Sequence, residues 1–165
     1  MRGEEYGGFW RRAAAALVDQ VVLNLFYFCI FVVLFGALYL GALLEVAAYD
    51  PFETTDGALV IYQGLSVLAN GAYFVYFHGS RGQTPGKILL GLRVVPVGGE
   101  RMTYGIAFLR WVGYLVSALF LFLGYLWVAF DGRKQGWHDK IAGTYVVRTD
   151  RRHPEIGLDK GEAIL

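Results

Sequence analysis

Three long runs of apolar residues dominate the chain, and most of its charged residues lie between or outside them. The runs cover residues 13–44, 57–77 and 104–130. Each is long enough to cross a hydrocarbon core of about 30 Å as an α-helix. The pattern therefore predicts an all-α membrane protein with three long apolar helical segments.

The composition favours the same class. Of the 165 residues, 56% are hydrophobic, and the mean hydropathy is +0.43. These values are typical of membrane proteins and disfavour the alternative, a soluble domain with buried helices. The first run is far longer than the apolar core of a signal peptide, so we expect it to be retained. The net charge of +1 gives no indication of a nucleic-acid partner.

The charges are unevenly distributed along the chain. The connection after the first run is acidic, whereas the N-terminus and the connection after the second run are basic. By the positive-inside bias, the basic parts lie in the cytoplasm and the acidic connection lies outside. We therefore predict a multi-pass protein of the prokaryotic inner membrane.

The third apolar run conflicts with this topology. Three complete spans would place the C-terminal tail outside, yet the tail carries seven basic residues. Either the run bends back as a re-entrant pair of short helices, or the tail breaks the positive-inside rule. We prefer the bend and a cytoplasmic tail, with Gly113, Ser117 and Gly124 as kink candidates.

Two short segments outside the runs have β character. Residues 88–97 and 143–149 are rich in β-branched and aromatic side chains. If the tail is cytoplasmic, both segments share a compartment and can pair as a small cytoplasmic β element. Residues 150–165 are polar, and we expect them to form a mobile tail.

No motif indicates an enzyme, a cofactor or a metal. "RGQTPGKI" lacks the first glycine and the Ser or Thr of a phosphate-binding loop. We interpret it as a Thr-Pro-Gly turn at the membrane surface, with Lys87 near lipid phosphates. The three histidines and the single Cys29 do not have the spacing of a metal site.

Charged residues within apolar surroundings are the candidate site. Asp19 lies inside the first run, where a carboxylate is costly unless a partner offsets its charge. Arg12, seven residues earlier, and Arg110 in the third run are the candidate partners. We predict an ion or proton pathway formed by Arg12, Asp19 and Asp139, with a supporting polar cluster of Arg110, Asp131 and Asn70. The alternative is that these residues only fix the register of the helices.

Three stretches together resemble one known family. They are "GFWRRAAAALVD", "TPGKILLGLRVV" and "LRWVGYLVSALFLFLGYLWVAFDGRKQGWHDKIAGTYVV". The chain resembles the RDD family of small prokaryotic membrane proteins, named for one arginine and two aspartates. By position these residues correspond to Arg12, Asp19 and Asp139, and the resemblance implies a transmembrane domain over residues 8–149. It also implies exchange of sodium or another monovalent cation for protons, a suggested activity of the family.

Two functional hypotheses follow. The first is a small transporter exchanging monovalent cations for protons in the lipid bilayer. Three segments make only a narrow bundle, so we expect such a transporter to be a homo-oligomer. The second is a non-catalytic assembly or accessory protein that docks a protein partner through its cytoplasmic loop and tail.

Overall fold

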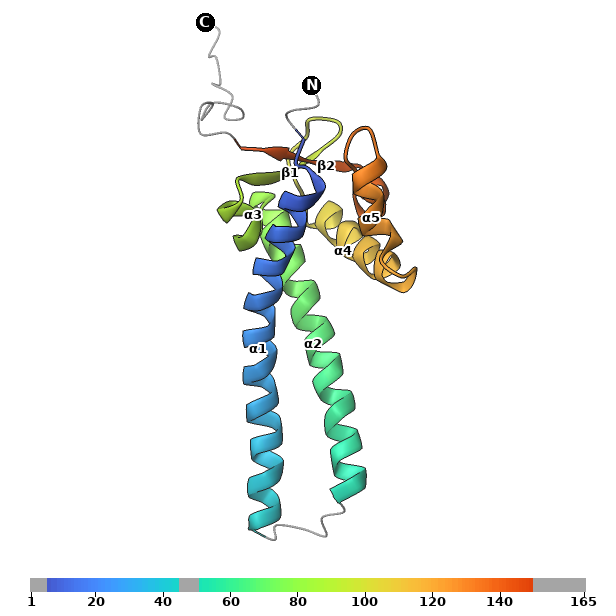
Figure 1. Ribbon diagram of the computed structural model, residues 1–165. Helices are drawn as coiled ribbons and strands as arrows, with labels where there is room; N and C mark the ends of the chain where they lie inside the picture. The colour runs from blue at the N-terminus through green and yellow to red at the C-terminus, as the bar shows by residue number, and fades with distance from the viewer. Residues whose placement is uncertain (1–5, 45–50, 150–165) are drawn as a thin grey trace, which may run out of the picture.

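A long helical hairpin with a compact head at one end makes up the structure, which is a computed structural model (Figure 1). It describes residues 6–44 and 51–149. The hairpin consists of α1 (Phe9–Leu43) and α2 (Pro51–Arg81). The head contains α3 (Pro85–Leu89), β1 (Leu92–Pro96), α4 (Tyr104–Leu119), α5 (Leu123–Phe130), α6 (Trp137–Ile141) and β2 (Thr144–Arg148).

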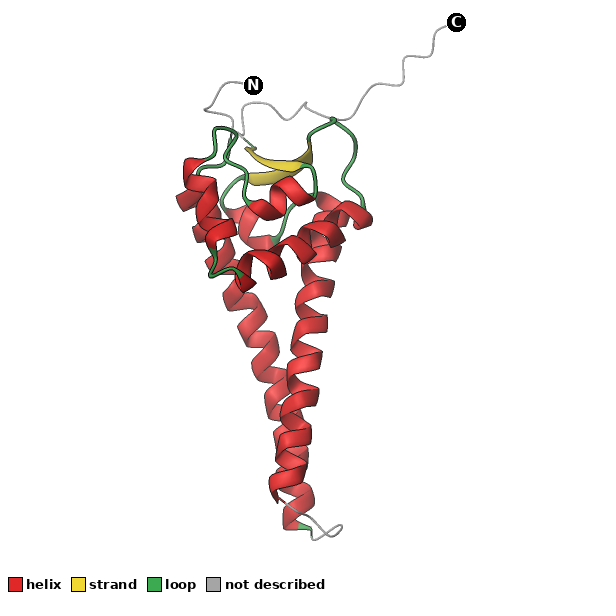
Figure 2. Cartoon of the chain, turned by 90° about the vertical axis from the view of Figure 1, so that its right-hand side faces the viewer, coloured by secondary structure: helices red, strands yellow, loops and turns green. Residues whose placement is uncertain are grey.

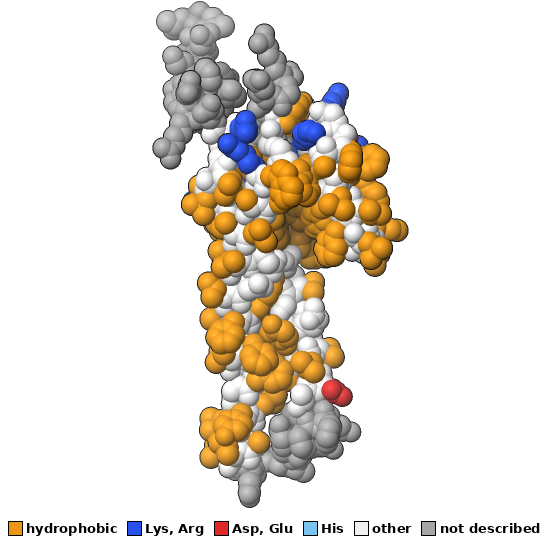
Figure 3. Space-filling model, in the orientation of Figure 1, with side chains coloured by type: hydrophobic (Ala, Val, Ile, Leu, Met, Phe, Trp, Pro, Cys, Tyr) orange, Lys and Arg blue, Asp and Glu red, His pale blue; other side chains and the backbone are white. Residues whose placement is uncertain are grey.

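The hairpin provides two membrane spans. α1 has 35 residues, which is about 52 Å at 1.5 Å per residue, and the candidate span within α2, Thr55–Arg81, has 27 residues. Side chains along both helices are largely exposed, and Figure 3 shows hydrophobic groups covering the hairpin while Lys and Arg gather around the head. Such a surface is stable in lipid, so the first two predicted spans are confirmed.

The third apolar run forms a bent pair of helices, as predicted. α4 and α5 meet at an angle of 101°. The two ends of the pair lead to β1 and β2, which lie in one sheet, so the chain returns to the side from which it entered. Its tip is apolar and exposed, with Leu121 at 82% and Phe122 at 61%.

The bend lies elsewhere than predicted. It falls at Leu121 and Phe122, which adopt left-handed backbone angles of φ 50° and 61°. Gly113 and Gly124 serve close packing instead: an added Cβ would meet the His138 backbone at 2.6 Å or the Ser117 Cβ at 2.7 Å. The kink prediction was wrong because small residues mark close approach as well as bends.

The predicted β element is confirmed over most of its length. β1 and β2 pair antiparallel, with Val94 opposite Val146. Leu92, Val94 and Val146 pack against Ala15 of α1. The first residues of the predicted strand instead belong to α3 and the turn after it. The Thr84 side chain caps α3 and Pro85 occupies its first turn, a combination that starts a helix.

The described chain begins and ends at the sheet. Tyr6 bridges to Val147 of β2, and Figure 2 shows both strands at the end of the molecule away from the C-terminal end of α1 and the N-terminal end of α2. The two ends of the described chain thus lie at the same end of the molecule, which predicts that they share one side of the membrane. The predicted mobile tail, residues 150–165, lies outside the described residues.

Single cysteines test this topology in a Cys29→Ala background. We expect cysteines at Lys134 and Thr149 to resist an impermeant maleimide on intact cells and to react after lysis. A cysteine at Asp56, exposed at the opposite end of α2, is the matched control and should react on intact cells. Labelling of all three from outside would show that the bent pair crosses the membrane as a third span.

Candidate functional site

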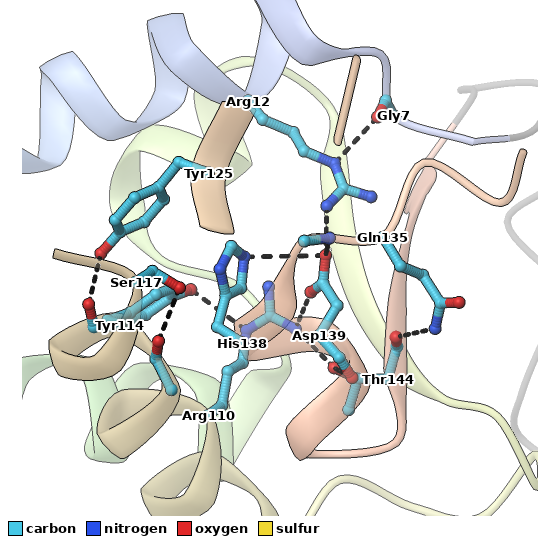
Figure 4. A network of polar contacts seen from close by, with 12 residues as sticks. Gly7, Arg12, Arg110, Tyr114, Ser117, Tyr125, Gln135, His138, Asp139 and Thr144 are labelled. Atoms are coloured by element: carbon cyan, nitrogen blue, oxygen red, sulfur yellow. Dashed lines mark hydrogen bonds and ion pairs between the residues drawn. The ribbon is translucent and has the colours of Figure 1, made fainter. Parts of the chain in front are cut away.

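Two buried polar networks lie in the head, and the first surrounds Asp139 (Figure 4). The guanidinium of Arg12 lies 2.6 Å from Asp139 Oδ2, and that of Arg110 pairs with Oδ1. The backbone N–H of Gly136 also donates to Oδ2 at 2.9 Å. One carboxylate at the start of α6 therefore binds α1 and α4 at once. We call Arg12, Arg110 and Asp139 the ion triad.

The ion triad is sealed from solvent. Asp139 is fully buried, Arg110 is 1% exposed and the Arg12 side chain is 10% exposed. Burial alone would raise the pKa of the Asp139 carboxyl, but the neighbouring charges of Arg110 and Arg12 outweigh it and hold that pKa well below its usual range. Asp139 is therefore a permanent anion at neutral pH, and its charge is fixed rather than exchangeable.

Uncharged groups complete the surroundings of the triad. Arg110 also donates to the Thr144 hydroxyl at 2.5 Å and to the Tyr114 hydroxyl at 3.1 Å, which fastens β2 to α4. Burial lowers the pKa of His138 to about 3, so its imidazole is neutral. Its ring packs against Tyr114 and Tyr125, with centroids 4.5 and 5.3 Å away. His138 acts here as an aromatic packing group.

The second network holds Asp19. Its carboxylate accepts hydrogen bonds from the Tyr73 hydroxyl at 2.8 Å, the Thr84 hydroxyl at 2.5 Å and the Gly86 N–H at 2.8 Å. Asp19 is 1% exposed. Position 86 requires glycine, because an added Cβ would clash with the Ala15 carbonyl of α1. This close contact allows α3 to reach the carboxylate.

The predicted partner of Asp19 was wrong. Among the described residues, no Lys or Arg lies within ion-pair distance of Asp19, and both candidate arginines bind Asp139 instead. Arg12 and Asp139 are together as predicted, and Arg110 joins them, but Asp19 belongs to a separate network. Neutral hydrogen-bond donors stabilise it, which is an alternative way to keep a carboxylate in an apolar region.

The other two predicted supporting residues lie apart from the triad. Asn70 links the hairpin to α4: its amide donates to the Tyr27 hydroxyl at 3.1 Å and accepts from the Trp111 indole at 3.0 Å. Asp131 lies near the surface, 2.6 Å from the Lys140 ammonium. Burial would raise the Asp131 pKa, but hydrogen bonds from Lys140 and from backbone amides lower it overall. Both residues stabilise local structure.

Two buried residues beside the second network were not identified as site residues from the sequence. Lys87 was expected near lipid phosphates, but it is 8% exposed, and its Nζ lies 2.8 Å from Nε2 of fully buried His78. The reason for the error is that α3 folds against α1 and carries Lys87 inward. In the sequence Gly57, Gly64, Gly71 and His78 recur every seven residues and so fall on one helix face, a pattern that could have drawn attention to His78.

Double-mutant cycles distinguish the two networks. We expect Arg12→Ala or Asp139→Ala to lower the unfolding free energy by about 3 to 5 kcal/mol, because each leaves a buried charge unpaired. The double variant should regain part of that loss. The matched pair Asp19→Ala and Arg110→Ala should be additive in the same detergent unfolding assay. Rescue of Asp19→Ala by Arg110→Ala would restore the original prediction and contradict the structure.

Comparisons with known proteins agree with this architecture. The chain is 31% identical to the uncharacterized protein YxaI of Bacillus subtilis, over 87% of this chain and 98% of that protein. It is 32% identical to the uncharacterized membrane protein YteJ of the same organism, over 86% of this chain and 80% of the relative. A proline-rich antigen homolog of Mycobacterium tuberculosis shares 24% identity over 89% of this chain and 65% of its own length.

No solved structure matches the chain. The family model of the RDD family matches residues 6–143, a range that includes the hairpin, the bent pair, the ion triad and the network around Asp19. The protein therefore belongs to the RDD family.

Proposed function

We propose that this protein is a small, non-enzymatic transporter that exchanges a monovalent cation for protons, with Asp19 as the exchanging carboxylate. The observation that carries the proposal is the chemistry around Asp19. Among the described residues, the donors to this buried carboxylate on a membrane helix are all uncharged, two hydroxyls and one amide. Ionisable groups at such positions commonly mark proton and ion pathways.

Asp19 is better suited to exchange than Asp139. The two guanidinium groups beside Asp139 repel any further cation and oppose its protonation. The hydroxyls of Tyr73 and Thr84 are adaptable, because a hydroxyl can accept a hydrogen bond as well as donate one. If a cation reaches Asp19, either hydroxyl can rotate and turn its oxygen lone pairs toward that cation. The site can thus admit a cation without moving a helix.

An apolar groove between α1 and α2 leads to this site. It has a volume of about 290 Å³ and is lined by Val22, Leu23, Phe26, Ala69, Ala72 and Tyr73. Tyr73 lines the groove and donates to Asp19, so its side chain connects the groove with the carboxylate. A swing of Tyr73 into the groove would open the site. This geometry supports a gating role for Tyr73.

A complete pathway requires further protein surface around the hairpin. α1 exposes large apolar side chains along its length, and a single hairpin cannot enclose a path across the bilayer. Copies of the chain packed around the hairpin would supply the missing walls, since interhelical packing drives association in lipid. A homo-oligomer therefore forms part of the proposal.

Flux through liposomes tests it. Purified parent protein should move sodium or lithium in response to a proton gradient, and Asp19→Asn should abolish this flux. The substitution keeps the size of the side chain and an oxygen acceptor but cannot carry the charge. Asp131→Asn, which changes a carboxylate near the surface, is the matched control and should transport like the parent.

Two results would contradict the proposal. Transport by well-folded Asp19→Asn at the parental rate would remove Asp19 from the pathway. An absence of sodium, lithium and potassium flux in every sample would favour the accessory protein.

A further inference from the structure

Lys87 and His78 form a buried contact that the proposed exchange at Asp19 does not use. Lys87 Nζ lies 2.8 Å from His78 Nε2, and His78 Nδ1 lies 2.9 Å from the Phe74 carbonyl oxygen. A carbonyl oxygen can only accept, so Nδ1 carries the hydrogen and Nε2 is the acceptor. Lys87 therefore donates to a neutral imidazole.

This contact provides little compensation for a charge on Lys87. The side chain is 8% exposed, and among the described residues no carboxylate lies within 4.0 Å of its ammonium. A buried ammonium that lacks a close anion is costly. The neutral amine keeps an N–H and can make the same hydrogen bond to Nε2. The contact is thus compatible with both charge states of Lys87, and it does not favour the charged form strongly.

Lys87 is also connected to Asp19. Its backbone N–H lies 3.4 Å from the Thr84 hydroxyl oxygen, and this hydroxyl donates to Asp19 at 2.5 Å. Besides Asp19 of α1, the charged groups that act on Lys87 are Arg110 of α4, Asp139 of α6 and Arg12 of α1. The ion triad carries one net positive charge and so cannot offset a second one. Among these groups, Asp19 is therefore the anion that Lys87 can balance.

We infer that Lys87, hydrogen-bonded to His78, is a proton-binding site that alternates with a monovalent cation in balancing the charge of Asp19. In one state Lys87 is an ammonium, and its charge offsets the carboxylate. In the other, one proton passes from Nζ to solvent water, the electron pair stays on nitrogen, and a remaining N–H still donates to His78. This inference rests on the proposed function and specifies its proton carrier.

The electrostatic surroundings support the assignment. Burial lowers the pKa of Lys87 to about 7, and the charge of Arg110 acts in the same direction, against the opposing effects of Asp19 and Asp139. An ordinary lysine has a pKa near 10.4. Below pH 7, the folded and unfolded chains both bind this proton. Between pH 7 and about 10 only the unfolded chain binds it, so this group makes the folded state more stable as pH rises.

Lysine NMR measures this titration directly, without transport. The chain has four lysines, so protein labelled at lysine Cε should give a simple ¹³C spectrum in detergent or nanodiscs. We expect one resonance to titrate near pH 7, well below the ordinary lysine value of about 10.4. Lys87→Arg should remove the unusual resonance. If that variant does not fold, arginine at the other three lysines assigns the Lys87 resonance by elimination.

His78→Asn serves as the partner test. It removes the imidazole acceptor, and because an ammonium donates a stronger hydrogen bond than a neutral amine, the midpoint of Lys87 should fall modestly, by about half a pH unit. In thermal unfolding, Lys87→Met should reduce the rise in stability between pH 7 and 10, while Lys140→Met, at an exposed lysine, should retain it. Titration of Lys87 together with the other lysines would overturn the inference, whatever the flux result.

The inference and the proposed function fail in distinguishable ways. If the parent shows no cation flux but Lys87 titrates near pH 7, the proton-binding site stands and its coupling to a transported cation is withdrawn. If flux depends on Asp19 while Lys87 titrates near pH 10, the transporter stands without this proton carrier. If both hold, Lys87→Met should retain a cation leak that no longer depends on the proton gradient.

Discussion

The pairing of one buried carboxylate with two arginines holds the head of this protein together. Arg12 is at the start of α1, Arg110 lies within α4 and Asp139 is at the start of α6. Through Thr144, the same arginine fastens the sheet. Burial makes each ion dependent on the others, because an unpaired charge there is destabilising. The ion triad therefore fixes α4 and the sheet relative to the base of the hairpin, where α3 packs.

Asp19 and Asp139 have opposite electrostatic surroundings. Asp139 lies between fixed positive charges, whereas Asp19 is held by groups that carry no charge. The head thus contains one carboxylate with fixed charged partners and another whose hydrogen-bond partners are uncharged. Lys87 and His78 extend the adaptable network toward α2. The two buried carboxylates therefore differ in whether charged or uncharged groups stabilise them.

Much of the fold could be predicted from the sequence because it depends on local patterns. Apolar length predicted the spans, and the basic tail predicted the return of the third run. The partners of Asp19 could not be predicted, since Tyr73, Thr84 and Gly86 come from elements far along the chain and are common residue types. The bend at Leu121 and Phe122 has no glycine or proline to indicate it. The inward direction of Lys87 follows from the packing of α3 on α1.

The order of the triad's members along the chain has a consequence for biosynthesis. Both arginines precede Asp139, and Arg110 does so by 29 residues. The hairpin and α4 are therefore synthesised before the carboxylate that pairs with their arginines. β2 begins five residues after Asp139, so neither the sheet nor the buried ion pairs can be completed until α6 and β2 have been synthesised.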